Sequence, residues 1–261
     1  MRRKVLFITL LCMLVGAAVA YAATGVNNYT GSKVTWSHGS GSSKKPVAVG
    51  YKETLVANNL DSSKAAAVLV DIKTKFYGLK SNAKDFPTCN GSQMVSQKSD
   101  SFCPKKSKFA TGLVNSLLGD PTLAKSDRIP CNPNLDVFNA GNNKLWFFFT
   151  THSATQCAGL TTGATAPYPG KVSQQGKYLV TDVPLPPDVS TRVANQPNFY
   201  GSLIKETLNF AKITTKVKGK TVGNTVSVGC KKGKRPYSVT FTATTNGTNR
   251  IKQTINGSAK C

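Results

Sequence analysis

One segment near the middle of the chain constrains the fold more than any other. Positions 135 to 151 read LDVFNAGNNKLWFFFTT, two apolar runs around a polar turn, which is typical of a β-hairpin. Successive strand side chains point to opposite faces of a sheet, and in the second arm these faces are Leu145, Phe147 and Phe149 against Trp146 and Phe148. Because both faces are apolar, we expect a central strand that is covered on both sides. An apolar ligand groove along one face is the alternative.

The N-terminal segment, residues 1–22, predicts a secretion signal. Three basic residues at positions 2–4 precede an uncharged, largely apolar run that ends at Ala20, and Ala20-Tyr21-Ala22 has the small-x-small pattern of a cleavage site. The apolar run is shorter than the roughly 20 residues that a spanning helix needs. We therefore expect a secreted protein, extracellular or associated with the cell wall, with no membrane span after the signal is removed.

The remaining residues, 23–261, predict a single secreted β domain. No low-complexity linker divides them, although a split into two smaller domains would fall within 185–198. Residues 23–60 are rich in Gly, Ser, Asn and Thr. We leave open that they form a flexible N-terminal extension.

Six cysteines remain once the signal, which carries the seventh, has been removed. An even number of cysteines in an exported chain predicts three disulfides, although the sequence cannot choose among the possible pairings. We favour bonds between sequential neighbours, of which the last would fasten the C-terminus. These pairs are Cys89 with Cys103, Cys131 with Cys157, and Cys230 with Cys261. Because the chain has no C-x-x-C motif and only two histidines, we expect no metal site and no cofactor.

The chain is strongly basic. Its 34 lysines and arginines outnumber 11 aspartates and glutamates, which gives a net charge of +23, and just two of the acids, Glu53 and Glu206, are glutamates. Such an excess favours contact with a polyanion, here an anionic cell-wall polymer or glycan, and a solvated surface without a dedicated partner is the alternative. A nucleic-acid module would add a recognition motif or stacking aromatics. None is visible, so no specific nucleic acid is expected.

Basic residues are densest around two late turns. A strand within 199–217 leads through a Gly-Lys turn into a second strand, so lysines fall at the tip of a hairpin, and further basic residues follow Cys230. The candidate polyanion-binding residues are Lys216, Lys218, Lys220, Lys231, Lys232, Lys234 and Arg235. If these tips gather at one end of the molecule, they form the strongest basic patch in the chain. Charges that protect sheet edges against aggregation are the alternative.

Alternating apolar and polar residues predict strands along most of the chain. The clearest examples are Val68 to Tyr77, Lys177 to Val183, and a C-terminal hairpin around Asn246-Gly247. Many short strands with little convincing helix predict an all-β fold. We expect an antiparallel β-sandwich-like domain with at most one or two short helices, stapled by disulfides.

Two segments are ambiguous. Phe109 to Leu118 fits a short helix about as well as a strand. Residues 153–169 read as a long loop, and long loops often carry binding residues. Within this loop, Tyr168 is either a packed residue or a stacking platform for a sugar.

Several short motifs carry a resemblance to a known group. They are Phe86-Pro87-x-Cys89, Cys103-Pro104-Lys105-x-Ser107, Asp136-Val137-Phe138-Asn139, Gly176-Lys177 leading to Val183-Pro184, and the late Cys230 and Cys261. Over about residues 65 to 261 the chain resembles secreted, disulfide-bearing β proteins of unassigned function from high-GC Gram-positive bacteria. It departs from their pattern in lacking a glycine pair after Ser107 and in adding Cys131 and Cys157. The resemblance implies a location and a fold, and it carries over no catalytic residue.

Three functions remain in play. We prefer a non-enzymatic extracellular protein that binds an anionic polymer through its basic turns. A polysaccharide hydrolase is an alternative, but it would need a close carboxylate pair, and Glu53 and Glu206 are far apart in the sequence. The other alternative is a carrier that holds an apolar ligand on the face of Trp146 and Phe148.

Overall fold

The structure, a computed structural model, describes residues 27–36, 39–59, 63–158, 163–193, 196, 199–244 and 249–261. The predicted signal peptide and the Asn246-Gly247 turn lie outside these ranges. Within them the chain is mostly strand, in agreement with the all-β prediction. The α-helical segment of the described residues is Gly91–Gln97 (α1).

The strands are numbered along the chain. They are Asn27–Trp36 (β1), Val47–Ala48 (β2), Tyr51–Asn59 (β3), Val68–Tyr77 (β4), Leu79–Ser81 (β5), Lys108–Gly119 (β6), Ile129–Cys131 (β7), Asn134–Gly141 (β8), Lys144–Thr151 (β9), Gly163–Ala164 (β10), Tyr168–Gln175 (β11), Tyr178–Pro184 (β12), Tyr200–Phe210 (β13), Thr214–Val217 (β14), Lys220–Gly223 (β15), Thr225–Ser227 (β16), Lys234–Thr244 (β17) and Ile251–Lys260 (β18).

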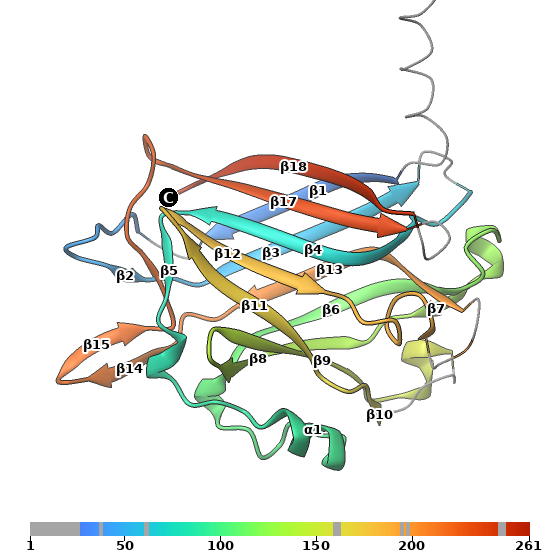
Figure 1. Ribbon diagram of the computed structural model, residues 1–261, viewed down its shortest axis with the longest axis horizontal. Helices are drawn as coiled ribbons and strands as arrows, with labels where there is room; N and C mark the ends of the chain where they lie inside the picture. Colours follow the sequence, from blue (N-terminus) through green and yellow to red (C-terminus); the bar gives the residue numbers. More distant parts are fainter. Residues whose placement is uncertain are drawn as a thin grey trace, which may run out of the picture.

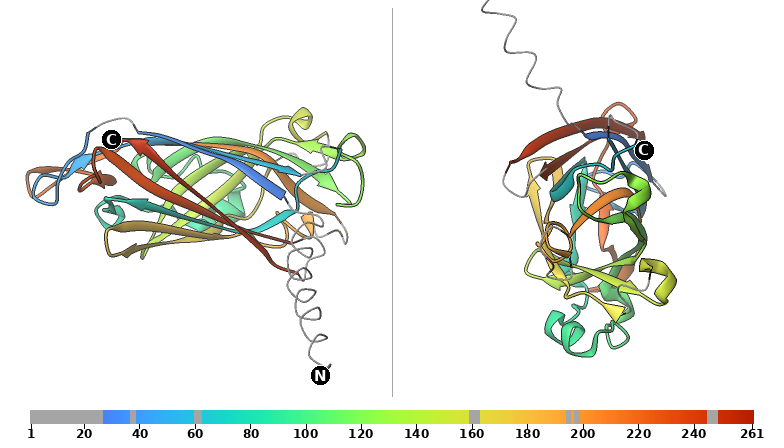
Figure 2. Two further views of the ribbon diagram at one scale, coloured as in Figure 1. Left: turned by 90° about the horizontal axis from the view of Figure 1, so that it is seen from above. Right: turned by 90° about the vertical axis from the view of Figure 1, so that its right-hand side faces the viewer.

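A 13-stranded antiparallel sheet dominates the fold. Its strand order is β1-β3-β13-β6-β8-β9-β11-β12-β4-β17-β18, with β7 and β10 paired to β6 and β9. The outermost strands β1 and β18 lie side by side (Figure 1), so the sheet curls into a nearly closed, barrel-like layer around the main hydrophobic cluster. The expected antiparallel β domain is confirmed, and its two layers are opposite sides of this single curled sheet. In the right-hand view of Figure 2 the strands surround the core, and α1 lies outside them.

The two ends of the curled sheet differ. At one end, which we call the mouth end, β6 finishes, β13 begins, and the segment 185–193 crosses over (right-hand side of Figure 1). At the other end, the tip end, lie the β14–β15 hairpin, the turn at 231–234 and the C-terminus. Small sheets made of β14 with β15, and of β2, β16 and β5, extend the tip end.

The central hairpin forms as predicted. Its arms are β8 and β9, in the middle of the sheet order. One face of β9 points into the core through Phe147, and the opposite face is covered by the segment that contains α1, where Phe148 packs on Cys89 and Met94. A Cβ at Gly91 would lie 2.8 Å from the indole of Trp146, so glycine lets α1 approach this closely. The strand is therefore covered on both sides, as expected.

Other parts of the sequence prediction were incomplete. The ambiguous segment 109–118 is strand β6, because its neighbours β13 and β8 supply the pairing that its own helical spacing could not reveal. Residues 153–169 are interrupted by the short strand β10 and end in β11, so Tyr168 belongs to the sheet. The possible N-terminal extension supplies β1 and β3, which pair with each other and with β13.

All three predicted disulfides are present. They join Cys89 to Cys103, Cys131 to Cys157, and Cys230 to Cys261. They lie in different places: beside α1, at the mouth end, and at the tip end. Such bonds form in oxidising compartments, so the disulfides indicate that the protein folds outside the reducing cytosol. In the described residues there is no helix long and apolar enough to cross a membrane.

Candidate functional site

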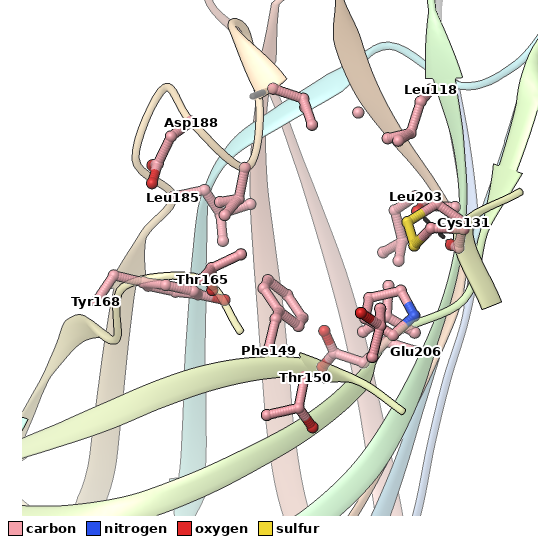
Figure 3. A pocket seen from close by; sticks show the side chains of 18 of the residues that line it. Leu118, Cys131, Phe149, Thr150, Thr165, Tyr168, Leu185, Asp188, Leu203 and Glu206 are labelled. Atoms are coloured by element: carbon pink, nitrogen blue, oxygen red, sulfur yellow. Dashed lines mark hydrogen bonds between the residues drawn. A yellow bond between two sulfur atoms is a disulfide. The ribbon is translucent and has the colours of Figure 1, made fainter. Parts of the chain in front are cut away.

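The core of the curled sheet contains a cavity at its mouth end. Its volume is about 490 Å³, and it is lined by side chains from β4, β6, β9, β11 and β13 and from the crossing segment 185–193. Figure 3 shows Tyr168, Thr165, Leu185 and Asp188 along one side of the space and Leu118, Cys131, Leu203 and Glu206 along the other. The lining is mainly apolar, and this volume falls within the range of small-molecule sites.

The aromatic wall of the cavity comes from the central hairpin and its neighbour. Phe149 and Tyr168 both line the cavity, and the Tyr168 ring lies 5.8 Å from that of Phe149 and 5.6 Å from that of Phe147, centroid to centroid. Tyr168 is buried, so it is a packed residue that also forms part of a wall. The inward face of β9, rather than the Trp146 and Phe148 face, therefore borders a ligand-sized space.

Glu206 reaches the cavity because β13 contains a bulge. The register with β6 shifts between Leu203 and Lys205, so Ile204 is an extra residue in the strand. Strict alternation would place Leu203 and Glu206 on opposite faces, but both line the cavity. Bulges of this kind redirect side chains and are frequent beside functional sites.

Glu53 lies deeper, on the neighbouring strand β3. Glu53 pairs with Leu208 and Leu55 pairs with Glu206, so the two glutamates are diagonal neighbours on the inner face. Such neighbours are roughly 7 Å apart. Both line a second, smaller cavity of about 40 Å³ that continues inward from Glu206. The two glutamates are far apart in the sequence, but the pairing of β3 with β13 brings them together in the fold.

The interior changes the acidity of both glutamates. Burial raises the pKa of Glu206 to about 7, although its side chain keeps some accessibility toward the cavity. Burial, and then the nearby Glu206 charge, raise the pKa of Glu53 to about 8. One carboxylate oxygen of Glu53, Oε1, is buried without a hydrogen-bonding partner. These are the effects expected of carboxyl groups held away from water with no cation beside them.

The inner end of the small cavity is closed by aromatic rings. Tyr51 stacks on Phe210 with centroids 4.3 Å apart, and its ring lies 5.3 Å from that of Phe76. Burial, and then the Glu53 charge, raise the pKa of the Tyr51 hydroxyl, so this phenol stays neutral. The two cavities together are therefore open at the mouth end and closed toward the tip end.

The predicted polyanion-binding residues lie at the tip end, away from the cavity. Six of them have exposed side chains: Lys216, Lys218, Lys220, Lys231, Lys232 and Lys234. Arg235 does not join them, since it is 1% exposed. Its guanidinium donates to the carbonyl oxygens of Tyr77 and Gly229 and to Ser227 Oγ, which makes it a structural residue of the tip end.

Sequence reasoning missed the cavity and its carboxyl groups. A signal was nevertheless present, because each glutamate occupies an inward position of an alternating strand, Glu53 between Tyr51 and Leu55, and Glu206 before Leu208. A carboxylate where the pattern requires an apolar residue indicates a buried polar site. That both point into one cavity depends on strand order and on the bulge, which the sequence does not show.

The described residues contain no cluster of three or more His, Cys, Asp or Glu side chains that could hold a metal ion. In comparisons with known proteins, the chain matches no family model, no curated protein and no solved structure.

Proposed function

We propose that this protein is an exported binding protein that holds an apolar small molecule in the cavity of its curled sheet. The observation that carries the proposal is the cavity itself, about 490 Å³ of mainly apolar space bordered by residues of the main core. Protein interiors leave few voids larger than a water molecule, so an apolar space of this size that opens at the mouth end is typical of a ligand site rather than of ordinary packing.

A rigid frame supports this use of the cavity. The Cys131–Cys157 disulfide lines the cavity and joins β7 to the segment after β9. Arg128, which is buried, donates to the carbonyl oxygens of Leu117 and Tyr200 and to Ser202 Oγ, and so ties β6 to β13 beside the mouth. A preformed site of this kind binds without a large ordering cost.

The proposal is tested with Nile red, an uncharged apolar dye, added to the oxidised protein. Saturable fluorescence enhancement with one dye per chain is expected. Leu185→Trp should reduce dye affinity at least about tenfold, because Leu185 lines both cavities and indole would fill the space. The matched control is Val95→Trp, on the exposed side of α1, which should bind like the wild type. Equal binding by both variants, or no saturable binding by the wild type, would contradict the proposal.

A hydrolase is less well supported by the same geometry. The glutamates lie on neighbouring strands at one wall, and the space next to both is about 40 Å³. That is room for a few water molecules, not for a sugar ring between two flanking carboxyl groups.

A second function, polyanion binding, is favoured by the exposed lysines of the tip end. Because they lie at the end opposite the mouth, contact with an anionic polymer would leave the cavity accessible. The triple substitution Lys216→Gln, Lys218→Gln and Lys220→Gln should weaken retention on a teichoic-acid-like polyphosphate column, and added salt should weaken wild-type retention. Retention that is independent of salt would exclude this function.

A further inference from the structure

The sign of charge in the cavity is opposite to that of the chain. Among the described residues, the ionisable groups that line the two cavities are Glu206, Asp188 and Glu53, together with the phenols of Tyr168 and Tyr51, and no described lysine, arginine or histidine lines them. The whole chain, in contrast, carries a net charge of +23. An anionic head group, such as that of a fatty acid, would find no counter-charge inside, and burying an unpaired charge is costly.

The interior carboxyl groups also lack partners that would explain them structurally. Glu53 Oε1 is buried and unpaired. The salt bridges found in the described part of the chain use Lys73 and Lys108, and neither glutamate takes part in one. A buried polar group without a partner is uncommon in proteins and suggests that another molecule completes its bonding.

The position of Glu206 fixes the orientation of such a molecule. Glu206 borders both cavities, so its carboxyl group lies at the inner end of the large one, while Asp188 lies in the crossing segment at the mouth. The ring of Tyr168 lines both spaces beside it, and aromatic faces attract cations. A head group that donates hydrogen bonds would enter first, and the apolar body would fill the larger space behind it.

We infer that the ligand is an amphipathic amine, whose ammonium group pairs with Glu206 near Glu53 and whose apolar body fills the 490 Å³ cavity. This inference rests on the proposed binding function and specifies its ligand class. The ammonium supplies a cationic donor, which none of the described lining residues provides, and charge-assisted bonds of this type are about twice as strong as neutral ones.

The test compares three ligands that share one chain length and differ in head group: decylamine, decanol and decanoate. Each displaces Nile red from the oxidised protein at pH 8, where the amine is still protonated and Glu206 is mostly ionised. Decylamine should bind at least about tenfold more tightly than decanol, and decanoate more weakly than either. Glu206→Gln should remove the preference for decylamine over decanol, and Glu53→Gln should reduce it.

The matched control is Asp127→Asn, which removes one negative charge from an exposed position and should leave the decylamine preference unchanged. Nile red binding with no preference among the three head groups would overturn the inference and leave the binding function standing. A preference that survives Glu206→Gln, or is lost in Asp127→Asn, would also overturn it. If neither Nile red nor any of the three ligands binds, the binding function itself fails.

Discussion

Two buried ionisable sites, Arg235 at the tip end and the glutamates of the cavity, are bonded in opposite ways. At the tip end, the Arg235 guanidinium donates to Tyr77 O at 2.6 Å and to Ser227 Oγ at 2.6 Å. At the inner end of the cavity, Glu53 has an unpaired oxygen, and the charge that raises its pKa after burial is that of another carboxyl group, Glu206. Burial is favourable for a polar group only when its bonds are made. The comparison therefore separates an ionisable group whose hydrogen bonds hold the fold together from carboxyl groups that have no such role in the described structure.

The largest effect is expected from removing the hydrogen bonds that the Arg235 guanidinium donates at the tip end. Arg235→Met keeps much of the side-chain volume but leaves the Tyr77 and Gly229 carbonyl oxygens unpaired, so the free energy of unfolding should fall by about 3–5 kcal/mol. Urea unfolding under oxidising conditions measures it. Arg192→Met, at an exposed position, is the control and should change stability by less than about 0.5 kcal/mol. A similar small change for both arginines would contradict the structural role of Arg235.

The second-largest loss of stability is expected from a neutral buried group, the Asn139 side chain. Asn139 is fully buried, and its Nδ2 donates to the carbonyl oxygens of Ala83, Phe86 and Pro87, which holds the segment leading to α1. Asn139→Ala removes all three bonds and leaves Ala83 O with only its bond from the Phe86 N–H, so a loss of about 2–4 kcal/mol is expected. Asn209→Ala, on the exposed face of β13, serves as the control. Equal denaturation midpoints for the two variants would show that the amide network contributes little.

The two glutamates of the cavity should make the free energy of unfolding depend on pH. The pKa values of Glu53 and Glu206 are raised in the folded protein, so the folded state binds more protons than the unfolded state between about pH 4.5 and their folded values near 8 and 7. Stability is therefore expected to fall as pH rises through this window. Tyr51 and Tyr168 remain neutral there, because burial raises the pKa of both hydroxyls.

Substitution of either carboxyl group should flatten this dependence. Glu53→Gln should remove roughly 2–3 kcal/mol of the difference in unfolding free energy between pH 5 and pH 8, and Glu206→Gln a similar amount. Urea titrations at both pH values give the measurement. Asn209→Ala, which removes no carboxyl group, is the control and should keep the wild-type pH dependence. Parallel pH profiles for the wild type and both glutamine variants would refute the assignment.

Arg235 and the glutamates also show how much of the fold and of the site could be predicted from the sequence. The central hairpin, the strand at 68–77 and the three disulfides follow from local patterns and from cysteine spacing. Arg235 was placed with the surface lysines because its immediate neighbours are basic, whereas its burial depends on β5, β16 and the end of β4 meeting at the tip end. Local pattern predicts strands, but it does not predict which strands become neighbours.

The cavity could not be predicted from the sequence for a related reason. Its carboxyl groups come from β3 and β13, which are distant in sequence and adjacent in the sheet. The bulge near Ile204 then decides the face on which Glu206 lies. A shift of one residue reverses the inward and outward sets of a strand, so periodicity alone could not place Leu203 and Glu206 on one face.

The smallest effect is expected from charges that are neither buried nor paired. Combined Lys216→Gln, Lys218→Gln and Lys220→Gln should change the free energy of unfolding by less than about 0.5 kcal/mol, with any change toward greater stability, because the three ammonium groups are exposed and repel one another. Nile red affinity should also stay the same, since the hairpin lies at the end opposite the mouth. Urea unfolding and dye titration of one preparation test both statements. A decrease of 2 kcal/mol or more in the free energy of unfolding would mean that these lysines stabilise the fold as Arg235 does. The exposed lysines could then no longer be distinguished from the hydrogen-bonded Arg235 by their effect on stability.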